Sequence, residues 1–555
     1  MGSVTAGLER WEFWWQSRRD RFLHLRRRLD RGRAAPGSPG FLTARRGPAA
    51  GASEDLGPKR VSEELLPALL KLADDAHDSD IIDSSLVAMA RSAGPDEQDA
   101  VRAALARLLP HPQRTVSAAA ALSLGILGGE ASRDALIPVL LNDSAGRQAV
   151  GSGSVDWFVR SFAALGLGLV GDHESGQALL DLLATLPDSE RDLKASVLAA
   201  LGLSEPGPRL LYRSLGELRP LLLDADLDPV LRSYVPTSLA KACGRLALPE
   251  LTRVLLDDAT PNAVLQSTVI ALGLVARLDD AEVAEAMRDT IVSQRDEPTR
   301  HFALIALAEM GARDVERRAG AGAHAALVEQ LHREVAGKGR DRGHRSWGAL
   351  ASAIYADAHT AARSELIESV REAFDDERDP SFRGAQALAL GLMDDTHSGE
   401  TILEALEKSQ QDEFVGHASM ALGLLRHTPA FHELSSLCAD PRLQPDARLQ
   451  VAMGLGLLAR DDVLPVLLES LAGANSLDVL EGTANALGLV GDGRALGQLV
   501  ELANDPQEPS LPRAFACVAL GLLGERSELP FHVALREYNN YGAQVPAIAE
   551  MLRIL

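Results

Sequence analysis

The stretch that decides the fold is Arg513-Ala-Phe-Ala-Cys-Val-Ala-Leu-Gly521-Leu-Leu-Gly524, because its pattern returns along the chain with small changes. Related stretches begin at Arg160, Arg383 and Arg448, and in each an arginine stands eight residues before a glycine. The equivalent anchor positions are Gly125, Gly168, Gly202, Gly244, Gly273, Ala308, Ala353, Gly391, Gly423, Gly456, Gly488 and Gly521. The last five are 32 or 33 residues apart. Such a period is typical of repeat proteins, whose units bury their apolar faces by stacking on their neighbours.

Each repeat unit is predicted to be a pair of helices. Small and apolar residues recur at helical spacing before each anchor, and a break such as Gly171-Asp172 or Gly491-Asp492 precedes a second apolar stretch. A glycine costs a helix about 1 kcal/mol relative to alanine. Its recurrence therefore indicates that neighbouring helices approach closely at that point. We expect an all-α fold, a right-handed α-solenoid of about 12 helical hairpins.

A second feature precedes the glycine-rich run, an Asp-x-x-x-Arg pattern that is clearest in residues 156–160 and 379–383. With that run it resembles the HEAT repeat, in particular its short bacterial form related to phycobilisome lyases, over about residues 62–555. The resemblance implies hydrogen-bonded ladders of Asp and Arg between successive repeats, and a concave face towards which the second helices point. The residues to which it gives this structural role are Asp156, Arg160, Arg300, Arg345, Asp379, Arg383, Arg448 and Arg513.

Composition agrees with thin, stacked helix pairs rather than a large globular core. Hydrophobic residues make up 46% of the 555 residues but aromatic residues only 4%, so the core consists of Ala, Leu and Val. The three cysteines form no disulfide or metal framework in the sequence: Cys243 and Cys517 occupy packing positions and Cys438 stands alone. Such a scattered, odd number fits a reducing compartment.

Residues 1–30 are predicted to form a basic, aromatic amphipathic helix. Three tryptophans, Trp11, Trp14 and Trp15, lie within five positions. One helical face is expected to carry Trp11, Trp15, Phe22, Leu25 and Leu29, with Arg18, Arg19, Arg26 and Arg28 largely off it. Three interpretations stay open. The helix caps the first hairpin or lies along the side of the solenoid, it docks on a second subunit or another protein, or it adsorbs to a membrane surface, which is not favoured.

The other predicted domains follow from composition. Residues 31–60 form a Gly/Pro-rich linker, residues 61–525 the repeat solenoid, and residues 526–555 C-terminal capping helices that close the last exposed core face. Residues 1–60 carry 13 Lys and Arg against 6 Asp and Glu, a net charge of +7. Because the whole chain has a net charge of −22, the remaining residues carry −29. An acidic solenoid argues against nucleic acid as the main ligand.

A locally basic insertion lies between two helices at residues 337–345. Its cations, Lys338, Arg340 and Arg342, are candidate partner-binding residues. The insertion is either a solvated loop or a contact for an acidic partner or a phosphate.

Motifs that carry chemistry are missing from the sequence. It contains no His-Glu-x-x-His, Cys-x-x-Cys, Gly-x-Ser-x-Gly or Walker sequence, and its 14 histidines are dispersed. We therefore predict no catalytic residue, no cofactor and no metal. The sequence as written shows no signal peptide or transmembrane segment, which predicts a cytoplasmic protein.

The function predicted from these observations is a non-enzymatic scaffold that binds one or more protein partners. One alternative is an enzyme similar to phycobilisome lyases or to HEAT-like glycosylases. Another is a self-assembling structural protein, a homo-oligomer held together by the N-terminal arm.

Overall fold

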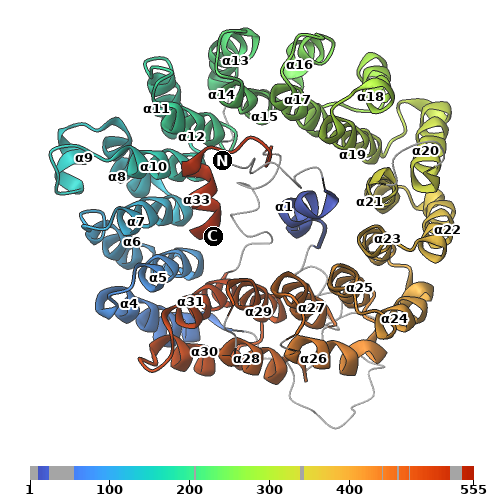
Figure 1. The fold of residues 1–555 in the computed structure, drawn as a ribbon. Helices are drawn as coiled ribbons and strands as arrows, with labels where there is room; N and C mark the ends of the chain where they lie inside the picture. The colour runs from blue at the N-terminus through green and yellow to red at the C-terminus, as the bar shows by residue number, and fades with distance from the viewer. Residues whose placement is uncertain are drawn as a thin grey trace. The chain divides into compact units, whose positions relative to one another are not determined.

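The computed structural model describes residues 10–23, 56–204, 208–337, 343–440, 442–458, 460, 462–473, 476–525 and 540–554. Throughout these ranges the secondary structure is helical and contains no strand. The chain divides into two compact units (Figure 1). Unit 1 comprises residues 1–18, 102–373 and 531–555, and unit 2 comprises residues 19–101 and 374–530. The predicted linker lies mostly outside the described residues, which resume at residue 56.

Unit 1 is built from two rows of helices. The helices of the first row contain an anchor position or end directly before one: α7 (Arg114–Leu127), α10 (Trp157–Val170), α12 (Arg191–Leu201), α14 (Pro229–Ser233) with α15 (Val235–Cys243), α17 (Asn262–Val275), α19 (Glu297–Arg313) and α21 (Gly343–Ala358). The second row contains α8 (Glu130–Leu141), α11 (His173–Leu183), α13 (Pro208–Leu223), α16 (Leu248–Leu255), α18 (Ala281–Ser293) and α20 (Gly320–Ala336). Helix α9 (Ser144–Ala149) lies between α8 and α10 in the chain, and the 3₁₀ helix η2 (Gly244–Ala247) lies between α15 and α16.

Unit 2 repeats the same arrangement. Its first row is α5 (Ser79–Ser92), α23 (Pro380–Leu392), α25 (Asp412–Leu424), α27 (Pro445–Leu457), α29 (Leu477–Val490) and α31 (Ser510–Gly524). Its second row is α4 (Leu66–Asp75), α24 (Gly399–Glu407), α26 (Phe431–Ala439), α28 (Val463–Gly473) and α30 (Ala495–Asn504). Shorter segments are α3 (Pro58–Arg60), η1 (Val61–Leu65), η3 (Thr396–Ser398) and η4 (Thr428–Ala430), and α6 (Gln98–Arg107) and α22 (Thr360–Asp376) each contain a boundary between the units.

Within each unit the first row lies on the inner side of the curved double layer, and the second row lies outside it (Figure 1). We call the exposed side of the first row in unit 1 the inner face. The expectation that the second helices line the concave side is therefore wrong. The first helices carry the small residues, and small side chains allow helices to stack more closely along the inside of a curve.

The anchor glycines pack as the sequence predicts. A Cβ atom added at Gly125 would lie 2.2 Å from Cα of Gly166 on the next first-row helix, and one added at Gly423 would lie 2.8 Å from Cα of Gly454. Real side chains do not approach backbone atoms this closely. The backbones of consecutive first-row helices thus touch directly, which accounts for the recurrence of glycine.

In unit 2, the first repeat packs on the last. Helix α5 lies against α31, and a Cβ atom added at Gly521 would lie 2.8 Å from Cα of Ala88. Beside this contact the guanidinium of Arg91 pairs with Glu525, with Nε 2.8 Å from Oε2, and both side chains are buried. The face of α31 that the sequence analysis expected the C-terminal helices to close is therefore covered by α5.

The C-terminal segment packs elsewhere, on the inner face. Helix α33 (Pro546–Ile554) contacts α12 and α10. The backbone N–H of Val545 donates to the hydroxyl of Tyr234 (3.0 Å), that of Ala547 donates to Asp192 (3.2 Å), and the side-chain amide of Asn540 donates to the carbonyl of Ala263 (3.1 Å). The segment thus satisfies its polar groups on the first-row helices of unit 1.

Candidate functional site

Residues 11–18 of the N-terminal helix α1 (Trp11–Leu23) belong to unit 1 and lie on its inner side (Figure 1). The indole rings of Trp11, Trp14 and Trp15 are buried to 2%, 2% and 1% exposure. Phe13, on the opposite side of the helix, is 41% exposed. The aromatic stripe predicted from the sequence is therefore covered by protein.

Two expectations about this helix change with the structure. Arg18 and Arg19 are buried, although the sequence analysis placed them largely off the aromatic face. The reason is helical geometry, because Arg18 follows Trp11 by seven residues and Trp14 by four, and these spacings return to the same face. Phe22, at the far end of the helix, is only half-buried. Of the interpretations left open, the structure shows the helix along the side of its own chain.

The surface that receives α1 is centred on Trp347 of α21. Its ring meets Trp14 edge-on, with centroids 5.7 Å apart and planes at 60°. His301 of α19 stacks on Trp347 from another side, with centroids 4.8 Å apart and planes at 15°. Phe302 and then Tyr541 extend the cluster, with centroids 6.2 Å apart for Phe302–Trp347 and 5.6 Å for Phe302–Tyr541. This aromatic surface thus combines α19, α21 and the C-terminal segment.

Histidines line the side of this surface towards α20. His344 lies at the start of α21 with its ring centroid 4.8 Å from that of His301, and its Nδ1 lies 3.4 Å from Oε2 of Glu334. All three of these side chains are buried. Sequence reasoning missed His301, His344 and Trp347, because their only local signal is an aromatic or imidazole ring on a helix that is otherwise small and apolar.

A second buried polar cluster ties α19, α20 and α21 together. Nε2 of His324 lies 3.0 Å from Oδ2 of Asp314, and Nδ1 of His324 lies 2.7 Å from the hydroxyl of Tyr355. His359 Nε2 donates to the carbonyl of Gly311 at 2.7 Å. Burial raises the pKa of Asp314, but hydrogen bonds from the amides of Ala319 and Arg318 outweigh it and hold that pKa below its ordinary value.

The protonation states follow from these contacts. Burial lowers the pKa of His324, despite the neighbouring Asp314, so the imidazole is neutral at pH 7. The ionised Asp314 accepts from Nε2–H, which leaves Nδ1 to accept from the Tyr355 hydroxyl. An Asp–His–Tyr series of this kind resembles a catalytic relay, but Asp314, His324 and Tyr355 are 2%, 2% and 0% exposed. It holds the turn between α19 and α20 in place and offers no reactive atom to a substrate.

Three of the repeating arginines bind backbone carbonyl groups. The Nε of each of these three donates to a carbonyl near the C-terminus of the preceding second-row helix: Arg160 to Leu140 (2.9 Å), Arg345 to Val335 (3.4 Å) and Arg513 to Ala503 (3.0 Å). These carbonyls have no partner within their own helix, and a cation also complements the helix dipole there. Arg232 donates to Leu222 in the same way (2.7 Å), and sequence reasoning missed it because Pro236 breaks the helix and shifts the spacing.

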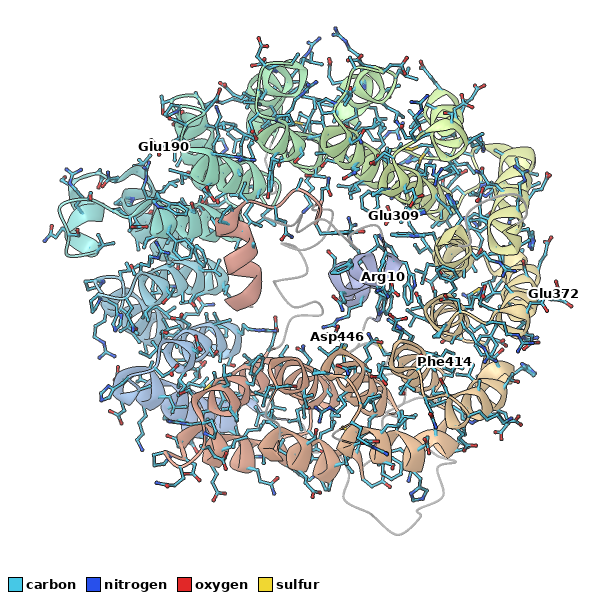
Figure 2. The ribbon with its side chains drawn as sticks, in the orientation of Figure 1. Arg10, Glu190, Glu309, Glu372, Phe414 and Asp446 are labelled. Atoms are coloured by element: carbon cyan, nitrogen blue, oxygen red, sulfur yellow. The ribbon has the colours of Figure 1, made fainter. Side chains whose placement is uncertain are left out.

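Side-chain pairs between successive repeats are present in part. Nη1 of Arg160 lies 3.3 Å from Oε2 of Glu190, which Figure 2 labels at the start of α12, and Arg191 pairs with Asp228 of the next repeat at 3.1 Å. Asp156 and Asp379 instead cap their own helices, where they accept from the N–H groups of Phe158 and Ser381. The expected ladder for these two aspartates is thus replaced by N-capping.

The other arginines of the series differ. Arg300 contacts Glu297 within its own helix at 3.6 Å. Arg383 lies over the rings of Phe374 and Phe414, 4.5 Å and 5.3 Å from their centroids, and Figure 2 labels Phe414 on α25. Burial lowers the pKa of Arg383. At Arg300, Arg383 and Arg448 the Nε atom has no hydrogen-bond partner among the residues that the structure describes. The eight-residue spacing therefore marks one position in the repeat with more than one role.

The remaining candidates carry less. Lys338, Arg340 and Arg342 lie outside the described residues. Within the described ranges, no three His, Cys, Asp or Glu side chains are close enough together to hold a metal ion. The same part of the chain has no helix with the length and apolar character needed to cross a membrane. An open groove lined by Leu248, Thr252, Leu256, Glu282 and Val283 lies between α16 and α18.

Stacked pairs of helices with a fixed period define an α-solenoid, a class of repeat protein whose exposed faces serve for contact with other molecules. Residues 442–521 match the family of HEAT repeats. This part of the chain therefore consists of HEAT repeats. No curated protein matches its sequence.

Three of the solved structures with a similar backbone fold have low sequence identity to this chain. Human deoxyhypusine hydroxylase in complex with glycerol is 19% identical, with 57% of this chain and 96% of that chain covered and a TM-score of 0.22. The Kap95:Nup1 complex is 12% identical, with 81% of this chain and 77% of that chain covered and a TM-score of 0.36. The karyopherin Kap121p, bound to the extreme C-terminus of the protein phosphatase Cdc14p, is 15% identical, with 80% of this chain and 53% of that chain covered and a TM-score of 0.31. The chain therefore spans about half the length of Kap121p.

Proposed function

We propose that this HEAT-repeat protein is a non-enzymatic scaffold that binds protein partners on the inner face of its first-row helices. The observation that carries the proposal is that this face already binds helices from distant parts of the sequence. Helix α1 contacts α21 through Trp14, and α33 contacts α12 and α10. A surface that accepts two unrelated helices has the shape and chemistry for helical segments of other proteins.

Charge and burial support protein over other ligands. The repeats beyond residue 60 carry a net charge of −29, which repels phosphate and favours basic protein segments. Trp11, Trp14 and Trp15 are buried against protein, so in this state they are not available to a membrane surface. Self-assembly through the arm would require α1 to leave Trp347 of its own chain.

The absence of enzymatic activity is part of the proposal. The side chains nearest to a catalytic arrangement, Asp314, His324 and Tyr355, bond to one another and are closed to solvent. Among the arginines of the repeating motif, Arg160 and Arg513 each donate to the end of the preceding second-row helix, which is a structural role.

Photo-crosslinking tests the location of the partner. Full-length protein with a photoreactive phenylalanine analogue at position 13, on the inner side, is compared with protein carrying it at position 256, an exposed position directly after the second-row helix α16. We expect discrete protein adducts in the source cells from position 13 and background labelling from position 256. Adducts from position 256 alone, or none from either position, would overturn the proposal.

A further inference from the structure

The search for further sites leads to the contact between α1 and the aromatic surface, because it joins an almost separate helix to a preformed cluster of rings. We propose that Trp347, His301, Phe302 and Tyr541 form an acceptor site for a tryptophan-bearing helix of another protein, and that α1 occupies this site in the free protein. The inference rests on the proposed function and deepens it, since it names the surface and the kind of partner.

The first argument is that α1 depends on what it touches. A helix of 13 residues is marginal in water by itself. Its three tryptophans and Arg18 lie on one side and are almost completely buried, whereas Phe13 on the other side is exposed. Residues 24–57 separate it from α3, so it is joined to the repeats by a long connection. The tryptophan side of helix α1 is thus buried and the side that carries Phe13 is exposed.

The second argument concerns the acceptor. Trp347 is fixed from behind by His301, which stacks on it at 15°, and from the side by Phe302. These three side chains belong to α19 and α21, which pack together as consecutive first-row helices. The surface is therefore organised by the repeat stack and does not depend on α1 for its shape. Without α1, the side of Trp347 that meets Trp14 would lose that cover, and apolar surfaces of this kind mark interaction sites.

The third argument defines the partner. Trp14 supplies an indole edge to Trp347, and Trp11 and Trp15 flank it at helical spacing. Arg18, one turn later, is 5% exposed, so the buried side of α1 includes a guanidinium as well as indoles. Trp and Arg are residue types that dominate binding energies at protein interfaces. A fitting partner is an amphipathic helix with tryptophans one turn apart and an arginine or lysine in the following turn.

Physical competition decides between another protein and a second copy of this chain. A tethered helix has an effective concentration in the millimolar range, so an identical helix from a second copy cannot displace it at micromolar protein. A helix that binds more tightly can do so. The acceptor site therefore binds only partner helices whose affinity is high enough to displace α1.

A peptide experiment tests the acceptor site. The probe is a fluorescein-labelled peptide of residues 8–23, added to full-length wild type, to the triple variant Trp11→Ala/Trp14→Ala/Trp15→Ala, and to that variant with Trp347→Ala. We expect the triple variant, its own helix released, to bind the peptide at least tenfold more tightly than wild type, and the Trp347→Ala version to lose this gain. The matched control peptide carries alanine at its three tryptophans and should not bind.

Failure of the triple variant to bind, or equal binding after Trp347→Ala, would overturn the acceptor site. Circular dichroism checks that the repeats remain folded. A second readout needs no tryptophan substitution: wild type carrying Phe13→Cys, labelled with a fluorophore, should show released α1 once the peptide concentration exceeds the millimolar effective concentration of the tethered helix, and unchanged anisotropy at that concentration would contradict the proposal. A dimer of wild type in light scattering would assign the site to a second copy and overturn the partner assignment. Crosslinks from position 13 without peptide binding would leave the scaffold function in place and remove only this site.

Discussion

The glycines of this protein have very different surroundings, and adding one methyl group, as alanine does, has different consequences at different positions. At Gly125 an added Cβ atom would fall 2.2 Å from a backbone atom of α10, which cannot move aside without separating the helices. At Gly497, in the second-row helix α30, an added Cβ atom meets nothing within 4 Å. The same substitution should therefore have opposite effects at the two positions.

We predict that Gly125→Ala lowers the free energy of unfolding by about 1 to 3 kcal/mol, the usual cost of overpacking. Gly497→Ala should raise it by up to about 1 kcal/mol, because alanine loses less backbone entropy in a helix. Urea unfolding followed by circular dichroism measures both. A neutral Gly125→Ala would contradict direct backbone contact between α7 and α10.

Asp83 of α5 is a residue whose burial makes stability depend on pH. Burial, with smaller contributions from Asp80 and Asp78, raises its pKa to about 8, so the folded protein holds a proton there at neutral pH. An unfolded chain releases that proton near pH 4. Between about pH 4 and 8 the native state therefore binds more protons than the unfolded state, and stability falls as the pH rises.

We predict that Asp83→Asn is more stable than wild type at pH 7 to 8, and that this advantage becomes small or disappears at pH 5. The decrease in unfolding free energy with rising pH, which the variant should lack, is at most about 1.4 kcal/mol per pH unit. Unfolding midpoints at pH 5, 6, 7 and 8 give the measurement, with the exposed Asp75→Asn of α4 as the matched control. Parallel pH profiles for wild type and Asp83→Asn would show that Asp83 does not carry this dependence.

At the scale of elements, the junction between α5 and α31 contains a buried ion pair. The side chains of Arg91 and Glu525 are 2% and 6% exposed. Desolvation makes such a pair a modest net contributor, but removing one member leaves the other as an uncompensated charge. The pair thus specifies which helix surfaces meet more than it adds to stability.

We predict that Arg91→Met and Glu525→Leu each destabilise unit 2 by about 3 to 5 kcal/mol. The double variant should recover a large part of that loss, because no charge then remains buried. A double-mutant cycle from chemical unfolding provides the test. Additive losses would mean that the two residues act independently, contrary to the contact.

At the scale of the whole molecule, residues more than 400 positions apart share one stack in unit 2. Ala88 meets Gly521, Ser85 Oγ lies 3.5 Å from Sγ of Cys517, and Arg60 donates to the carbonyl of Gly493 at 3.0 Å. Repeat proteins transmit stability between neighbours. The last repeat should therefore protect the first from local opening.

We predict that Gly521→Leu accelerates amide hydrogen exchange in α5, residues 79–92, about tenfold for each 1.4 kcal/mol of lost junction energy. Exchange in α17 of unit 1 serves as the internal reference. Hydrogen exchange with mass spectrometry on the full-length protein resolves both segments. Protection of α5 that stays at the wild-type level would contradict packing of the first repeat on the last.

The prediction of HEAT repeats and of an all-α solenoid of stacked helix pairs is confirmed. These features were accessible because they are local: glycine eight residues after arginine, small residues one turn apart and a period of 32 or 33 residues all lie within one unit. The short bacterial subtype and the domain limits at residues 30, 60 and 525 stay predictions. Sequence alone also placed Trp11 and Trp15 on one helical face, and both side chains are buried.

Only the tertiary structure decided what those patterns meet. Arg91 and Glu525 are 434 positions apart, Asn540 and Ala263 are 277 apart, and no local spacing announces either contact. Trp14 contacts Trp347, and α31 packs on α5, because packing depends on the shape and polarity of two surfaces and not on their distance along the chain. The sequence determined the repeating unit through short-range periodicity, and the fold chose the neighbours, because surfaces with alike Ala, Leu and Gly patterns are told apart only by their full three-dimensional fit.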